Sequence, residues 1–403
     1  MRAINWSNII QLKKEANMSY KRFSALFMVA VLVMSFSYSR PAQAAPISNP
    51  GNGNGAKPVC PGPAAPGDSH CYAWVRPNAS ASPVGLTPAQ MKAAYGFSTS
   101  NTAGAGMTIA IVDAYDLPTA EKDLNVFSKQ FGLPECTTAN GCFKKVNQTG
   151  GTKYPRYNSG WGLEIALDIE WAHAIAPGAK ILLVEASSNS FANLLAAEDY
   201  AAAHANYVSN SWGASEFSGQ TAYDSHFSRP GVSFFVSAGD AGLPADYPSS
   251  SPNVISVGGT RLTFNSDGSL LSETGWSSGG GGCSLYETAT SAQSGFSGYA
   301  QVNCAGKRAT PDVSLDADPY SGAAVYDSSN YQGQKGWYQV GGTSLSSPMW
   351  AGRAAVSGAL VNAAYVYGNN VTYRDITSGN NGASCLGGFD LCSGRGSWTG
   401  ATP

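Results

Sequence analysis

Charged side chains are scarce in this sequence. They make up 12% of its 403 residues, and the formal net charge is −2. A protein that binds nucleic acid needs a concentration of lysine and arginine, so we expect no nucleic-acid partner. Histidine is also rare, with four copies. Abundant glycine, serine, threonine and asparagine supply the polarity instead, a composition that fits an exported protein.

Long apolar runs are lacking after the N-terminus. The one clear run, residues 25–34, follows four basic residues, at positions 13, 14, 21 and 22, and precedes the small residues Ala42-Gln43-Ala44. This layout is typical of a secretory signal peptide, and the run is too short for a comfortable membrane span. We therefore expect residues 1–44 to be a signal peptide, and a secreted product without membrane contact after its removal.

The eight cysteines lie close together in pairs along the chain. In an exported protein an even number of cysteines indicates disulfides, and small loops are easily closed. We predict bonds between sequence neighbours, with free buried thiols as the alternative. No histidine accompanies a Cys-x-x-Cys pair, so a cysteine metal site is not expected. The pairs are Cys60 and Cys71, Cys136 and Cys142, Cys283 and Cys304, and Cys385 and Cys392.

Composition divides the rest of the chain into two parts. Residues 45–85 are rich in proline, glycine and alanine and are predicted to be a linker, whereas residues 86–403 show the pattern of one domain. Within this domain short apolar runs alternate with helical patterns, which predicts an α/β fold with a parallel sheet covered by helices on both faces. The expected strands are 108–113, 180–185, 207–210, 232–237 and 254–257, and the expected helices are 161–175 and 190–205.

Ser344 is the first candidate for chemistry. It lies in Gly342-Thr343-Ser344, after an extended segment at 336–340 and before an apolar helical pattern that begins at Met349. At a helix N-terminus, free N–H groups favour developing negative charge. A serine there suits attack on a carbonyl group. An N-capping serine is the structural alternative.

Three acidic residues are candidates to assist it. Glu164 and Asp168 are four residues apart, so they share one face of the expected helix. Burial would raise the proton affinity of such a pair, which suits a general base and its orienting partner. Two solvated carboxylates are the alternative, but the surrounding residues are mostly apolar. Asp240 follows an apolar strand, where α/β proteins build sites, although an Asx-turn is also common there. Glu170 faces elsewhere and is taken as structural.

These motifs together resemble the sedolisins, or serine-carboxyl peptidases. The resemblance runs from about residue 86 to the C-terminus and includes Ala176-Pro-Gly-Ala-Lys-Ile181, Ser209-Asn-Ser-Trp-Gly213 and Pro311-Asp-Val-Ser-Leu-Asp-Ala-Asp-Pro319. It implies a subtilisin-like fold and hydrolysis of polypeptides at acid pH. It further implies that Ser344 is the nucleophile, Glu164 the base and Asp168 its orienting partner. Asp240, when protonated, would donate to the oxyanion.

The resemblance also implies one calcium ion near the C-terminus. Its ligands would be the carboxylates of Asp375 and Asp390 and the backbone carbonyls of Ile376, Leu386 and Gly388. Oxygen ligands on glycine-rich loops suit calcium. The family often has glycine where Leu386 stands, which matters only if the backbone there needs a positive φ. Loop aspartates without a metal are the alternative.

Two alternatives and one departure accompany this interpretation. A histidine-based subtilisin-like peptidase needs a histidine motif that the chain lacks, so Asp113 is interpreted as a strand-end residue. A catalytically inactive secreted binding protein would have lost one of the four site residues, and none is lost. The family usually carries a long folded propeptide, whereas only residues 45–85 precede the expected domain. We expect the protein to be a monomer. The sequence does not determine the cleavage specificity, nor whether the protein acts as an endopeptidase or as a tripeptidyl-peptidase.

Overall fold

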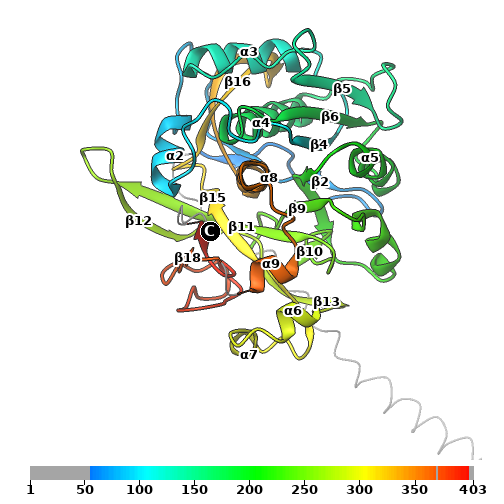
Figure 1. Ribbon diagram of the computed structural model, residues 1–403, viewed down its shortest axis with the longest axis vertical. Coiled ribbons are helices and arrows are strands. Elements are labelled where there is room, and N and C mark those ends of the chain that lie inside the picture. The colour runs from blue at the N-terminus through cyan, green and yellow to red at the C-terminus, as the bar shows by residue number, and fades with distance from the viewer. Residues whose placement is uncertain (1–54, 369–370, 399–403) are drawn as a thin grey trace, which may run out of the picture. The chain divides into compact units, whose positions relative to one another are not determined.

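A seven-membered path of mostly parallel strands forms the centre of the molecule (Figure 1). The computed structural model describes residues 55–368 and 371–398; the signal-peptide prediction and the first part of the predicted linker lie outside them. The sheet order is β12-β11-β9-β7-β4-β6-β5, with β15 also paired to β11, and only β12 is antiparallel to its neighbour. The strands are β4 Thr108–Ala114, β5 Phe143–Asn147, β6 Lys180–Ala186, β7 Tyr207–Asn210, β9 Ser233–Ser237, β11 Ile255–Phe264, β12 Leu270–Gly275 and β15 Val313–Asp316.

Helices cover both faces of this sheet. The helices α4 (Ser159–Ile175) and α8 (Thr343–Ser357) pack against each other and against the sheet, α3 (Ala120–Phe131) packs on α4, and α5 (Phe191–His204) covers strands β4 and β6 on the other face. The α/β fold predicted from the sequence is therefore confirmed. The expected strands and helices are present, with ends shifted by no more than two residues, except that the strand expected at 254–257 continues to Phe264.

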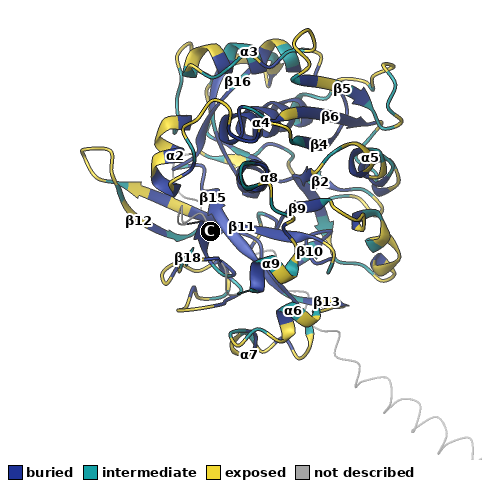
Figure 2. Cartoon of the chain, viewed as in Figure 1, coloured by how far each residue is buried: buried dark blue, intermediate teal, exposed yellow. Residues whose placement is uncertain are grey.

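Helix α4 is the most deeply placed helix. The side chain of Asn158 caps its start by accepting hydrogen bonds from the N–H groups of Gly160 and Trp161. Every residue from Trp161 to Ile175 is buried, as expected of a helix that is apolar on all sides. Figure 2 shows this burial as continuous dark blue through the centre of the fold. Carboxylates on such a helix cannot be solvated, so any acidic residue there must find a partner or a proton.

Helix α8 begins directly after strand β17 (Gln334–Gly341). The connecting residue, Gly342, has φ +94°, and a Cβ atom there would lie 1.9 Å from the carbonyl oxygen of Tyr72. Glycine is required on both counts. The strand–glycine–helix sequence predicted around Ser344 is confirmed, and it places Ser344 in the first turn of α8.

The prediction that residues 45–85 form a linker is wrong for residues 55–85. This part contains strands β1 (Lys57–Pro58), β2 (His70–Cys71) and β3 (Trp74–Val75). Strand β3 pairs with β1 and with β17, and β17 pairs with β16 (Ala323–Tyr331). In a second small sheet, β2 pairs with β8 (Trp212–Ser215), and β8 pairs with β10 (Asp246–Tyr247). Val59, Tyr72, Ala73 and Val75 are buried. We call residues 59–76 the covering segment, because it crosses the start of α8.

All eight cysteines form disulfides, and each joins the sequence neighbours that were predicted to pair. Cys136, Cys142 and His173 lie within 4.8 Å of one another, but both sulfurs are in one disulfide and so offer no thiolate to a metal. Among the described residues no helix is long and apolar enough to span a membrane.

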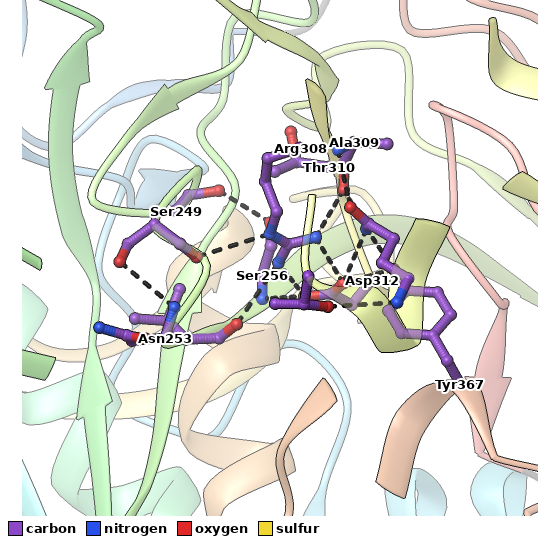
Figure 3. A network of polar contacts seen from close by, with 12 residues as sticks. Ser249, Asn253, Ser256, Arg308, Ala309, Thr310, Asp312 and Tyr367 are labelled. Atoms are coloured by element: carbon purple, nitrogen blue, oxygen red, sulfur yellow. Dashed lines mark hydrogen bonds and ion pairs between the residues drawn. The ribbon is translucent and has the colours of Figure 1, made fainter. Parts of the chain in front are cut away.

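The Pro311–Asp312 motif has a structural role. Figure 3 shows the guanidinium of Arg308 paired with Asp312, which also accepts hydrogen bonds from the N–H of Ser256 at 2.7 Å and the hydroxyl of Tyr367 at 2.5 Å. A buried charge pair is tolerated when such bonds satisfy it. The pair fastens β11 to the chain that enters β15. The remaining elements are α2 Pro88–Tyr95, η1 Gln220–Phe227, β13 Gly282–Thr288, α6 Ser291–Ser294, α7 Tyr299–Val302, β14 Lys307–Thr310, α9 Ala363–Tyr367, β18 Tyr373–Arg374 and β19 Ser397–Trp398.

Candidate active site

The site lies where the carboxyl ends of the parallel strands meet two helices. Strand β4 ends beside Asp113, β7 is followed by Ser211, and β9 is followed by Gly239 and Asp240. Because parallel strands all end at one edge of the sheet, these residues come together. Helix α4 contributes Glu164 and Asp168, and α8 contributes Ser344, as the packing of α4 on α8 requires.

Ser344 is held by reciprocal contacts with Ser211. Its hydroxyl donates to the carbonyl oxygen of Ser211 at 3.5 Å, and the Ser211 hydroxyl donates to the carbonyl oxygen of Ser344 at 3.4 Å. Ser344 is fully buried. Its side chain also interacts with Glu164, whose pKa it lowers. The serine therefore faces both a backbone acceptor and a carboxylate.

Glu164 and Asp168 lie on the same buried face of α4, as their spacing predicted. Both have no exposed surface. Burial raises the pKa of Glu164 well above its usual value, and the charge of Asp168 raises it further; the hydroxyl of Ser344 and the N–H of Ala73 act against this. Burial likewise raises the pKa of Asp168, with a further contribution from Asp113. The alternative of two solvated carboxylates is wrong.

Asp113 belongs to the same carboxyl cluster, which the sequence did not reveal. It is fully buried, and neither of its side-chain oxygens has a hydrogen-bond partner among the described residues. Burial raises its pKa, and so do the charges of Glu164 and Glu185. Burial also raises the pKa of Glu185 to about 8, although Lys145 lies 3.6 Å away. The cluster thus has a strong preference for holding protons.

Asp240 points one oxygen at Thr343 and leaves the other free. Its Oδ1 accepts from the N–H and from the hydroxyl of Thr343, each at 2.8 Å, while Oδ2 is buried without a described partner. Burial raises the pKa of Asp240 well above its usual value; the bonds from Thr343 lower it, and the charge of Asp246 raises it. A protonated Oδ2 beside the Ser344 turn is a suitable donor to an oxyanion.

The four histidines have other partners. His173 contacts the carbonyl oxygen of Pro134, His204 that of Tyr200, and His226 pairs with Asp199. His70 lies in β2, where its ring packs against Tyr72. In the part of the chain that the structure describes, none forms a hydrogen bond with Ser344. A carboxylate is the only basic side chain that meets the serine there.

Both carboxylates predicted to bind calcium contact the loop that contains Leu386 and Gly388. The carboxylate of Asp375 accepts from the N–H of Gly388 at 2.9 Å, and that of Asp390 accepts from the N–H of Leu386 at 2.6 Å. Two carboxylates from different segments therefore meet one short loop. Leu386 is not among the residues with positive φ, so its side chain is compatible with a carbonyl ligand. This donor set fits a hard cation.

Comparison with known proteins identifies the class. A model of the subtilase family matches residues 155–378, a stretch that contains all four predicted catalytic residues. The chain belongs to the subtilase family. The subtilisin-like fold implied by the resemblance is confirmed.

Within this family the relatives are sedolisins. Sedolisin of Pseudomonas sp. (strain 101) is 35% identical over 200 residues, which cover 41% of this chain and 32% of that protein. Kumamolisin of Bacillus sp. (strain MN-32) is 30% identical over 363 residues, covering 79% and 63% respectively. Xanthomonalisin of Xanthomonas sp. (strain T-22) is 29% identical over 391 residues, covering 77% and 45%. The chain thus spans from about 32% to 63% of the length of these relatives.

A solved structure extends the likeness to three dimensions. Pseudomonas sedolisin, a serine-carboxyl proteinase complexed with two molecules of pseudo-iodotyrostatin, superposes with a TM-score of 0.66 at 29% identity. The match covers 79% of this chain and 96% of that one. The resemblance to the sedolisins stated from the motifs is confirmed.

Proposed function

We propose that this protein is a secreted serine-carboxyl peptidase that hydrolyses polypeptides at acid pH. The observation that supports this most is the pairing of Ser344 with a buried carboxyl, Glu164, where no histidine is present. The proposed secretion draws on the signal-like residues 1–44 and on four disulfides, which persist in oxidising compartments.

In the proposed reaction, Ser344 attacks the carbonyl carbon of a substrate peptide bond while Glu164 takes the hydroxyl proton. Asp168 orients Glu164. It also keeps the negative charge that the two carboxyl groups share close to Glu164. The carbonyl oxygen becomes negative and accepts a hydrogen bond from protonated Asp240, beside the N-terminal end of α8, which favours negative charge. Glu164 then returns the proton to the leaving amine, and water hydrolyses the acyl-enzyme by the same route in reverse.

Calcium is a separate part of the proposal. Asp375 and Asp390 would hold it together with the carbonyls of Ile376, Leu386 and Gly388. The ion would fasten the segment 375–390 and would take no part in bond cleavage. The convergence of the two carboxylates on one loop supports this assignment.

The test is hydrolysis of a denatured protein across pH 3–8 by the wild type and by Ser344→Ala. We expect acid-side hydrolysis that the substitution abolishes. A properly folded wild type without hydrolysis at any pH in this range would instead support the inactive binding protein. A peptide-aldehyde adduct provides a second check, because its aldehyde carbon stands in for the attacked carbonyl carbon and should bond to Ser344.

A further inference from the structure

A disulfide encloses three of the five proposed calcium ligands. The Cys385–Cys392 bond joins cysteines seven positions apart and so closes residues 385–392 into one covalent ring. Leu386, Gly388 and Asp390 lie inside this ring. Cys385 directly precedes Leu386, and Cys392 follows Asp390 by two residues. The bond therefore limits how far these ligands can move apart.

Hydrogen bonds at the two ends of the ring fix the carboxylate of Asp390. The N–H of Leu386 donates to its Oδ2 at 2.6 Å. The N–H groups of Cys392 and Ser393 donate to its Oδ1, at 3.0 and 2.7 Å. One oxygen is thus held from the upstream end of the ring and the other from the downstream end. Opening the ring at Cys385 and Cys392 would separate these two sets of donors.

The two cysteines also contact the other half of the proposed site. The remaining ligands, Asp375 and Ile376, lie on a separate segment. The buried side chain of Ile376 forms a small apolar cluster with Cys385 and Cys392, apart from the main core. The carboxylate of Asp375 accepts from the N–H of Gly388, inside the ring, at 2.9 Å. The disulfide therefore lies where the two ligand segments meet.

The last residue of β12 packs closely against the disulfide. A Cβ atom on Gly275 would lie 2.2 Å from Sγ of Cys385 and 2.4 Å from Sγ of Cys392. The N–H of Gly275 donates to the carbonyl oxygen of Ser378 at 2.8 Å, and that of Cys385 donates to the carbonyl oxygen of Gly379 at 3.1 Å. Two unbonded sulfur atoms need more room than a bonded pair. Breaking the bond would therefore displace the ring, β12 or the segment that carries Asp375.

We propose that the Cys385–Cys392 bond is a redox control of the calcium site: the site binds calcium tightly only while the bond is formed, and bound calcium protects the bond. This inference rests on the calcium part of the proposed function. Reduction by a dithiol breaks the S–S bond, leaves two cysteine thiols and converts the dithiol to its own disulfide. The two effects are linked, because the factor by which the bond tightens calcium binding equals the factor by which calcium opposes reduction at equilibrium.

Burial of the sulfur atoms explains how calcium would protect the bond. Cys385 is 4% exposed and Cys392 is fully buried, whereas Leu386, in the same ring, is 50% exposed. A reductant therefore reaches the sulfurs only after the ring opens locally. A calcium ion held by the ring and by Asp375 opposes that opening, since a ligand bound only by the closed state stabilises it. Disulfides form in oxidising compartments, so the proposed secretion would complete the calcium site.

The first test measures calcium affinity by calorimetry. The full chain carries Ser344→Ala, so that no proteolysis disturbs the titration, and is compared with the same chain carrying Cys385→Ser and Cys392→Ser. We expect Kd to rise at least about tenfold, because the ring loses its covalent constraint. The control carries Cys136→Ser and Cys142→Ser instead, which opens a disulfide of similar span between α3 and β5, well apart from β18 and the chain that follows it (Figure 1). Its Kd should be unchanged.

The second test keeps every cysteine, so it holds even if the serine variant fails to fold. The Ser344→Ala chain is treated with dithiothreitol, either with calcium at about one hundred times its Kd or with a chelator. Free thiols are blocked with iodoacetamide at intervals, and peptide mass spectrometry follows each disulfide. Calcium should slow reduction of Cys385–Cys392 at least about tenfold and leave that of Cys136–Cys142 unchanged. Asp375→Asn, which lacks a ligand outside the ring, should lose this protection at the same calcium concentration.

The outcomes separate this inference from the calcium assignment on which it rests. If calcium binds but does not protect the Cys385–Cys392 bond, or binds equally well to a folded chain without it, the redox control is overturned and the calcium assignment stands. If calcium protects all four disulfides alike, it stabilises the whole fold, and the redox control is again overturned. If neither calorimetry nor elemental analysis finds calcium in the oxidised chain, both fall. Hydrolysis by Ser344 is tested separately and is affected by none of these results.

Discussion

Thr343 donates to Asp240 twice, from its backbone N–H and from its hydroxyl, and both bonds end on Oδ1. This arrangement fixes which oxygen of Asp240 stays free. If Asp240 is the oxyanion donor, as we propose, Oδ2 would carry the donated proton. Burial raises the pKa of Asp240 well above its usual value, which favours this protonated form.

The pH profile should reflect this proton. As pH rises through the folded-state pKa of Asp240, the carboxyl ionises and would repel the oxyanion, so we expect activity to fall. The reference pKa of about 3.9 with an upward shift places the optimum at roughly pH 3–6. Asp240→Asn keeps a donor that does not titrate. This variant should have a kcat about 10²–10³-fold lower than wild type, as for the loss of other oxyanion donors. The alkaline side of its pH–activity profile should also become flatter.

Asp246 provides the control for that assignment. Burial raises its pKa to about 6, so it too titrates in the relevant range. Its negative charge raises the pKa of Asp240. Asp246→Asn should therefore shift the alkaline limb to lower pH without flattening it. A flattened limb in Asp246→Asn, with an unchanged limb in Asp240→Asn, would reverse the roles.

Ser344, Glu164 and Asp168 should act as one unit. We expect Ser344→Ala, Glu164→Gln and Asp168→Asn each to reduce kcat by on the order of 10³-fold or more, and double variants to lose little beyond the worse single variant. Glu170→Gln is the matched control, because Glu170 lies on the same helix but accepts from the N–H of Tyr326, a bond that glutamine can keep. If Glu164→Gln kept most of the wild-type turnover, the assignment of Glu164 as the general base would be refuted.

Much of this site could be read from local sequence. The four-residue spacing of Glu164 and Asp168 fixes their shared face, and Gly342-Thr343-Ser344 marks a strand-to-helix turn. Asp113 was missed as a member of the cluster because its contacts arise only when β4 meets α4. The covering segment was missed because two-residue strands have no alternation signal, and its proline and glycine content is typical of a linker. Its placement depends on pairing with β8 and β17, far along the chain.

Calcium removal should destabilise the fold. If Asp375 and Asp390 hold the ion, a ligand bound only by the folded state stabilises it, by about 2.7 kcal/mol at one hundred times Kd. We expect excess chelator to lower Tm, re-addition of calcium to restore it, and Asp375→Asn to reduce the response. Asp267→Asn, in an exposed turn, is the control and should respond as wild type does. Elemental analysis that finds no metal, with a Tm insensitive to chelator, would remove calcium from the proposal.

Stability should also fall between acid and neutral pH, because of the buried carboxyl cluster. Burial raises the pKa of Asp113 above its unfolded value of about 3.9. Between these two values the folded state holds more protons than the unfolded state, so this contribution is complete below about pH 4 and is lost as pH rises toward the folded-state pKa. Asp113→Asn has no proton to lose. We would measure the unfolding free energy with denaturant at pH 4 and at pH 7. The difference between the two pH values should be smaller in Asp113→Asn than in wild type by at least about 1 kcal/mol, which is equivalent to less than one pKa unit. Glu135→Gln, an exposed carboxyl outside the cluster, should leave the difference unchanged. If Asp113→Asn kept the full wild-type difference, Asp113 would not be one of the groups that hold a proton in the folded protein.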